Sequence, residues 1–381
     1  MSVDTRGRIL KYLKWILSSA YLFFLTLSIV LMLIVFAYAE TGRARFLITA
    51  IILVLASPVA LICRMATESR RVLFRNIFLG TLCSSLALLG ILFWTAPVVK
   101  NTGAATSIFL NGGSHSRLVN VVPELDEMNF GLRISKQLGL TFGAEGQRLQ
   151  DLMLPLYREM EKDAEFRDLP AALDLSLAEL LKRPFDTGHV YQYVPQHRAD
   201  ERLPVVIFFH GFGGTAKTYF YLWHKLAEQH HVIVLCPTYG FGSYRTGSVE
   251  LVARMREYAL QSLPVDPNRI YLAGYSNGGL PVSRALNADA YGYAGAILFS
   301  PVIEPQFADT QTAIKHKFPL LIFAGENDDR IPIDYVKTNA EQLRKSGFPG
   351  TLETIPGEDH FLIYSSWNRA SESIVKWLKL P

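Results

Sequence analysis

The sequence predicts an α/β fold, with a mostly parallel sheet flanked by helices, preceded by three transmembrane helices. Three observations lead to this prediction. Long uncharged runs fill the first 100 residues, short apolar stretches alternate with helical patterns after residue 188, and a G-Y-S-N-G segment at residues 274–278 follows one such stretch. Half of the 381 residues are hydrophobic and only three are cysteine, which excludes a disordered chain and a disulfide scaffold.

Three apolar runs predict the membrane-spanning helices. They are Trp15–Ala39, Phe46–Cys63 and Ile77–Val99, and none contains Asp, Glu, Lys or Arg. Each run is long enough to cross a bilayer core, which takes about 17 to 25 helical residues. The alternatives are buried helices of a soluble protein, or a signal peptide, whose apolar region has only about 7 to 15 residues. Because no span carries an ionisable side chain that would mark a transport path, we expect the helices to serve as an anchor. The alternative is a sensing or lipid-presenting role.

The charges around these runs predict their orientation. Residues 1–100 hold 11 of the 38 basic and 3 of the 34 acidic residues, so this part has a charge of +8 and the remainder −4. The amino-terminal tail and the second connection each carry four basic residues, whereas the first connection has two beside Glu40. By the positive-inside rule the tail and the second connection are cytoplasmic. Three crossings then place everything after Lys100 on the outer face, periplasmic or extracellular in a bacterium and lumenal or extracellular in a eukaryote.

No basic cluster appears in the sequence after Lys100, so no nucleic-acid partner is expected.

Composition divides the chain into three expected parts: the anchor at residues 1–100, a linker with amphipathic helices at 101–187, and the α/β domain at 188–381. Up to Gly146 the linker is rich in Gly, Ser and Asn, which is typical of irregular or extended chain. Apolar residues then recur at helical spacing over 149–160 and 173–181, and Pro155 is expected to kink or restart the first helix. The two helices either pack on the α/β domain, or form a lid over its active site or a membrane-contacting surface.

Short runs rich in Val, Ile and Leu are the predicted strands of the α/β domain. Helical patterns such as Ser248–Gln261 and Ile333–Ser346 stand between them. Continuous apolar strands alternating with helices are typical of a parallel sheet covered on both faces. The predicted strands are Val190–Val194, Val205–Phe209, Val232–Leu235, Ile270–Ala273, Ala296–Phe299, Leu320–Ala324 and Leu352–Ile355.

The strand Ile270–Ala273 leads into a G-x-S-x-G motif centred on Ser276. In this motif a serine occupies a strained turn between a strand and a helix, and glycines such as Gly274 and Gly278 remove side chains that would collide with neighbouring backbone. A helix-like run, Leu280–Leu286, follows directly. The context favours a nucleophilic serine over an ordinary serine in a glycine-rich loop.

A serine hydroxyl needs a base to take its proton and a carboxylate to hold that base. Acidic residues at positions 326, 328 and 329 follow the strand Leu320–Ala324, and His360 follows the last strand. The carboxyl ends of parallel strands meet at one sheet edge, where such folds assemble their sites. The chain therefore offers Ser276, a carboxylate and His360 in the required order, with Asp328, Asp329 and Glu326 as the acids to choose from.

With these motifs the sequence resembles the α/β-hydrolase superfamily, and its GYSNGG and HGFGG elements are most similar to esterase and dienelactone-hydrolase-type members. The resemblance covers Val190–Leu380, half of the chain. It implies that Ser276 is the nucleophile, His360 the general acid and base, and Asp328 the orienting acid, because Asp328 has the family's usual distance from the preceding strand.

The same resemblance implies backbone donors for an oxyanion. They are the N–H groups of Asn277, after the nucleophile, and of Phe212 in the HGFGG loop, where Gly211 and Gly213 let the backbone approach a substrate. His210 is expected to hold this loop by hydrogen bonds, although a histidine there could also be considered as a base.

The predicted function is that of a membrane-anchored serine hydrolase that cleaves carboxylic esters, of a small-molecule or lipid-like substrate, through a Ser-His-Asp triad and an acyl-enzyme. The alternatives are an acyl peptidase, thioesterase or lipase of the same fold, or a non-enzymatic receptor or interaction protein. The connection Pro301–Phe318 is too short for a large cap domain, so a fairly open site is expected. No motif implies a metal ion or a nucleotide cofactor.

Overall fold

The structure is a computed structural model, and the chain within it forms two compact units. Unit 1 comprises residues 1–97 and 120–146, and unit 2 comprises residues 98–119 and 147–381. The structure describes residues 3–66, 71–101, 103–115, 120–137, 144–171, 188–213, 216–245, 247–288, 292–304 and 318–380.

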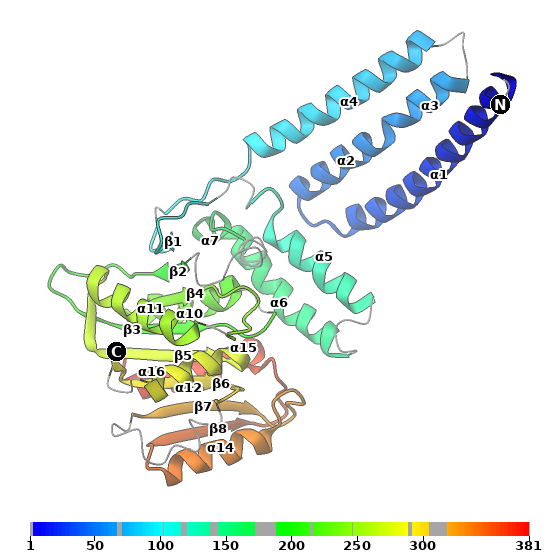
Figure 1. The fold of residues 1–381 in the computed structure, drawn as a ribbon. Helices are drawn as coiled ribbons and strands as arrows, with labels where there is room; N and C mark the ends of the chain where they lie inside the picture. Colours follow the sequence, from blue (N-terminus) through cyan, green and yellow to red (C-terminus); the bar gives the residue numbers. More distant parts are fainter. Residues whose placement is uncertain are drawn as a thin grey trace. The chain divides into compact units, whose positions relative to one another are not determined.

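Unit 1 contains the three helices that the apolar runs predict. Stretches Lys11–Tyr38, Gly42–Cys63 and Arg71–Trp94 are each long and apolar enough to cross a membrane. The middle stretch is built from two helices that meet at Ser57, whose N–H still donates to Leu53 (3.0 Å), so the apolar rod is continuous. Figure 1 shows these helices in blue and cyan. Their bounds are α1 Val3–Tyr38, α2 Gly42–Ala56, α3 Pro58–Ala66 and α4 Arg71–Trp94.

A helix that we did not predict, α5 (Glu124–Gln137), also belongs to unit 1. Its Asp126 accepts a hydrogen bond from the backbone of Glu40 (2.6 Å), and Asn129 donates to the carbonyl of Tyr38 (2.9 Å). The helix thereby satisfies backbone groups in the turn between α1 and α2. The expectation of irregular chain up to Gly146 was therefore wrong here, because three acidic residues in the first turn favour a helix start despite the polar composition.

Unit 2 is built around an eight-stranded sheet in the order β1-β2-β4-β3-β5-β6-β7-β8. Strands β3 to β8 pair in parallel, whereas β1 and β2 are antiparallel to their neighbours. All seven predicted strands are present, and Figure 1 shows them side by side with helices packed against them. The strands are β1 Ala105–Phe109, β2 His189–Tyr193, β3 Leu203–Phe209, β4 Ile233–Pro237, β5 Val265–Tyr275, β6 Gly295–Phe299, β7 Leu320–Gly325 and β8 Gly350–Ile355.

Strand β1 lies within the predicted linker, where we expected irregular or extended chain, and it was not among the predicted strands. Five residues are too short for a clear alternation, and the strand owes its place to pairing with the edge of β2, where Ala105 lies opposite Tyr193. The helix predicted at 149–160 is part of α6 (Ala144–Lys162), which continues through Pro155 without restarting. Pro155 lies on the exposed side of the helix. The helix predicted at 173–181 lies outside the described residues.

Helices cover both faces of the sheet, as the apolar strands predict. Along β3, Val205, Ile207 and Phe209 join a core with α11, α12 and α14, while Phe208 faces the other side and contacts Trp223 of α10 (5.7 Å between ring centroids). The helices of unit 2 are α6 Ala144–Lys162, α7 Ala164–Arg167, α10 Ala216–His230, α11 Ser248–Ser262, the 3₁₀ turn Ser276–Gly278, α12 Gly279–Ala288, α14 Ile333–Lys345, α15 Leu362–Ser365 and α16 Trp367–Leu378.

Candidate active site

Ser276 occupies the turn between β5 and α12, where the motif predicts a nucleophile. Its φ is +52°, a left-handed conformation that costs a non-glycine residue about 1–3 kcal/mol and persists only where the surroundings enforce it. A Cβ on Gly274 would lie 2.3 Å from the carbonyl oxygen of Gly278, and one on Gly278 would lie 2.0 Å from that of Phe209. Both positions therefore require glycine, because the turn brings backbone against backbone.

His360 lies between Ser276 and Asp328. Its Nε2 is 3.1 Å from Ser276 Oγ, and its Nδ1 is 2.9 Å from Asp328 Oδ2. All three residues are buried: the exposed fraction is 9% for Ser276, 4% for His360 and 5% for Asp328. The structure thus brings together, from the ends of β5, β7 and β8, the three residues that the sequence predicts as a triad.

Burial separates Asp328 from the two other candidate acids. Asp329 and Glu326 are exposed, whereas the Asp328 carboxylate receives the backbone N–H groups of Arg330 (3.0 Å) and Ile331 (2.8 Å) on its other oxygen. Burial alone raises the pKa of Asp328, but the hydrogen bonds from His360 and Ile331 and the charge of His360 outweigh it and lower the pKa. Asp328 is therefore an ionised, fixed acceptor for His360.

Tyr275 is a further residue at the site that the motif did not indicate. Its hydroxyl donates to the backbone carbonyl of His360 (2.9 Å), and the two rings lie 5.1 Å apart between centroids. Burial is the main cause that raises the pKa of Tyr275 well above its ordinary value, so the hydroxyl stays a donor. The residue next to Ser276 thus also fixes the backbone of His360.

The loop expected to supply an oxyanion donor lies directly against the nucleophile. A Cβ on Gly211 would lie 2.9 Å from the Tyr275 ring and 3.3 Å from the Cβ of Ser276. Gly213 has a φ of +68° and donates its N–H to the carbonyl of Phe241 (2.8 Å), so this amide is already used within the loop. The amides of Phe212 and Asn277 stay the predicted oxyanion donors. The Phe212 side chain is 67% exposed beside the site.

His210 holds this loop, as predicted. Its Nδ1 donates to the carbonyl of Gly211 (2.9 Å), and its Nε2 accepts the N–H of Tyr239 (3.3 Å). Complete burial lowers the pKa of His210 to about 4, although the bond to Gly211 acts in the opposite direction. Both ring nitrogens are therefore occupied in a neutral imidazole, which excludes His210 as the base.

A second contact between serine and histidine lies at the β1–β2 edge. Ser107 Oγ is 2.8 Å from His115 Nε2 and 2.6 Å from His189 Nε2. Ser107 is only 2% exposed, and the second nitrogen of His189 faces the Thr238 hydroxyl (3.3 Å) instead of a carboxylate. This cluster ties β1 to β2 but lacks both the access and the acid of a triad. Among the described residues, no three His, Cys, Asp or Glu side chains group as metal ligands.

Comparison with known proteins agrees with this fold. Residues 206–340, just over a third of the chain, match the model of the Alpha/beta hydrolase family. Together with the sheet order and the serine turn, this match identifies unit 2 as an α/β-hydrolase fold.

One curated relative and several solved structures are also similar to the chain. Acyl-protein thioesterase 1 of Gibberella zeae is 30% identical over 105 residues, which are 25% of this chain and 42% of that protein; the chain thus spans less than half of this relative's length. Est1E from Butyrivibrio proteoclasticus is 19% identical with a TM-score of 0.42, over 50% of this chain and 92% of that one. FphF, a fluorophosphonate-binding serine hydrolase of Staphylococcus aureus, is 18% identical with a TM-score of 0.41, over 50% and 91%.

Proposed function

We propose that the protein is a serine hydrolase in which Ser276, His360 and Asp328 act as the catalytic triad. The observation that carries the proposal is the unbroken hydrogen-bonded line from Ser276 Oγ through His360 to Asp328, at 3.1 and 2.9 Å. Further contacts position each member: the strained turn holds Ser276, the Tyr275 hydroxyl holds the backbone of His360, and two backbone amides hold Asp328.

The proposed reaction begins when His360 Nε2 takes the proton of Ser276 as the serine oxygen attacks the substrate carbonyl. The negative charge that develops on the carbonyl oxygen is stabilised by the N–H groups of Phe212 and Asn277, each worth about 10²- to 10³-fold in rate. His360 then gives its proton to the leaving group, and an acyl group remains on Ser276. His360 then takes a proton from water as the water oxygen attacks the acyl group, and it returns that proton to Ser276 Oγ as the acid leaves. Asp328 holds the imidazole in the tautomer with Nδ1 protonated throughout.

Carboxylic esters are the proposed substrates. The resemblance of the glycine motifs to those of esterases supports this class, and the exposed Phe212 side chain offers an apolar contact at the site. A thioester is the second candidate, favoured by the similarity of 105 residues to an acyl-protein thioesterase. The same residues would also serve an acyl peptidase or a lipase, and a non-enzymatic receptor is the alternative outside this class.

Labelling with a fluorophosphonate probe, together with hydrolysis of p-nitrophenyl acetate, tests the proposal. The detergent-solubilised protein should label and turn over, and Ser276→Ala should do neither. A receptor that only keeps the fold would do neither as wild type. Comparing matched oxygen esters, thioesters and anilides then ranks the bond types.

We further propose that unit 1 anchors the protein with unit 2 on the outer face. Within unit 1, Arg43, in the first turn of α2 beside the first connection, donates to the carbonyl of Thr95, at the end of α4 (3.0 Å), and to that of Val121 (2.8 Å). The chain therefore leaves α4 at the bundle end that carries the first connection, opposite the basic tail. A phosphatase that is active only outside the cytoplasm, fused after Lys100, should be active; an inactive fusion would reverse this orientation.

A further inference from the structure

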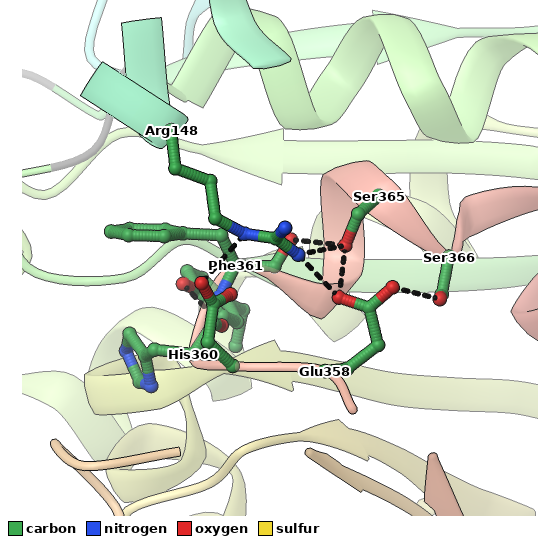
Figure 2. Close-up of polar contacts among 8 residues, drawn as sticks. Arg148, Glu358, His360, Phe361, Ser365 and Ser366 are labelled. Atoms are coloured by element: carbon green, nitrogen blue, oxygen red, sulfur yellow. Dashed lines mark hydrogen bonds and ion pairs between the residues drawn. The ribbon is translucent and has the colours of Figure 1, made fainter. Parts of the chain in front are cut away.

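Arg148, on the first half of α6, contacts the two residues that precede His360. Its Nη2 donates to Glu358 (2.7 Å), and its Nε lies 2.6 Å from a carboxylate oxygen of Asp359. Figure 2 shows the guanidinium reaching from α6 to the loop that carries His360. One cation thus joins a helix far away in the sequence to both carboxylates beside the proposed base.

The same loop is also held by two serines, one of which, Ser365, lies 3.4 Å from Arg148 Nη2. Glu358 accepts hydrogen bonds from the hydroxyls of Ser365 (2.6 Å) and Ser366 (2.9 Å), at the junction of α15 and α16 (Figure 2). Asp359 accepts the N–H of Phe361 (2.9 Å) in a turn that encloses His360. The carboxylates that bind Arg148 are therefore the ones that shape the backbone on either side of the imidazole.

The environment makes this contact stronger than an ordinary surface ion pair. The Arg148 side chain is 40% exposed, whereas those of Glu358 and Asp359 are only 17% and 19% exposed. Two partly buried carboxylates on adjacent residues repel each other, and a cation between them removes that repulsion. Without the guanidinium, we expect the two side chains to separate and to move the turn that holds His360.

We propose that Arg148 is a positioning residue that keeps His360 in register with Ser276. The inference rests on the proposed hydrolase function. A fixed imidazole matters because proton transfer depends steeply on the distance between His360 Nε2 and Ser276 Oγ, and a displacement of about 1 Å can cost 10²-fold in rate. The polar contacts of Arg148 are with Glu358, Asp359 and Ser365, so we expect it to act on His360 through the loop.

The chain offers a matched control for the docking of α6. Near the other end of the helix, Glu159 accepts a hydrogen bond from Lys225 of α10 (2.7 Å), and the Lys225 side chain is 42% exposed, close to the 40% of Arg148. Each pair joins α6 to the rest of unit 2 through one partly exposed cation. Only the Arg148 pair reaches the His360 loop.

The test compares Arg148→Met, Arg148→Lys and Lys225→Met in the full-length protein, with steady-state hydrolysis of p-nitrophenyl acetate and thermal unfolding. Arg148→Met should lower kcat about tenfold or more with KM changed less than about twofold, because the substrate contacts stay intact. Arg148→Lys should recover part of the loss, since an ammonium retains the charge but not the planar fork. Lys225→Met should keep the wild-type kcat at a similar melting temperature.

Two outcomes would overturn the inference. Equal kcat in Arg148→Met and the wild type would show that the loop holds itself, and equal losses in Arg148→Met and Lys225→Met would assign the effect to α6 docking. A wild-type protein that neither hydrolyses the ester nor labels at Ser276 would instead refute the proposed function, so the two failures are distinguishable.

Discussion

The substitution Asp328→Asn tests the acid of the proposed triad. One oxygen of Asp328 accepts two backbone N–H groups, from Arg330 and Ile331, and the other faces His360 Nδ1. In the asparagine variant the amide oxygen can keep both backbone bonds only if the amide nitrogen faces Nδ1. That nitrogen can only donate, so the imidazole proton moves to Nε2, which then cannot accept the proton of Ser276.

The expected loss is about 10³- to 10⁴-fold in kcat, equivalent to about 4–5.5 kcal/mol of transition-state stabilisation, with the fold preserved. Asp329→Asn removes the same charge from the neighbouring exposed residue and should change kcat by no more than about twofold. Hydrolysis of p-nitrophenyl acetate under saturating conditions measures both. Near-normal turnover by Asp328→Asn, or a large loss in Asp329→Asn, would refute the assignment of the acid and the tautomer argument with it.

Three further predictions concern the support of the site. Gly278→Ala should lower the free energy of unfolding by about 3 kcal/mol, because the added Cβ would lie 2.0 Å from a backbone oxygen. As a control, Gly350→Ala places its Cβ at 3.5 Å from Leu320 and should change that free energy by less than about 1 kcal/mol. Denaturant titration measures both. The pKa of His210 is about 4 in the folded protein and near 6.5 in the unfolded chain. Between these two pH values the unfolded state therefore binds more protons than the folded state. Stability should therefore fall by about 2 kcal/mol from pH 7 to pH 5, and His210→Asn should flatten that slope. Tyr275→Phe should cost about 1 kcal/mol in thermal unfolding, since it removes one buried hydrogen bond; an unchanged melting temperature would contradict this.

The sequence predicted the parts of the structure that local pattern determines. Continuous apolar strands such as Val205–Phe209 are distinct because parallel strands are buried on both faces, and the serine turn has a fixed glycine spacing that backbone contact enforces at Gly274 and Gly278. Among the three acids, the residues alone left the choice open, and the resemblance to the family favoured Asp328 by its spacing. The fold adds burial, which separates Asp328 from the exposed Asp329.

The features that the sequence did not reveal depend on contacts across long separations. Strand β1 forms by pairing with β2. The first residues of the two strands, Ala105 and His189, are 84 positions apart in the chain. Arg148 meets Glu358 across 210 residues, and nothing in the helical pattern around it distinguishes it from a solvated arginine. For α5 a signal was present, since acidic residues at positions 124, 126 and 127 are typical of a helix start. The Gly- and Ser-rich surroundings outweighed that signal in the linker prediction.

The proposed role of Ser276 as the nucleophile is tested by the position at which a covalent inhibitor binds. The full-length protein is treated with a fluorophosphonate, digested, and mapped by mass spectrometry. Ser107 provides the internal comparison, because it too lies within hydrogen-bond distance of histidine, but it is 2% exposed against 9% for Ser276, and His189 behind it faces the Thr238 hydroxyl instead of a carboxylate. A single stoichiometric adduct is expected on Ser276, and it should form far more slowly in Asp328→Asn and His360→Ala. An adduct on Ser107, or stoichiometric labelling that survives Ser276→Ala, would contradict the proposed role of Ser276.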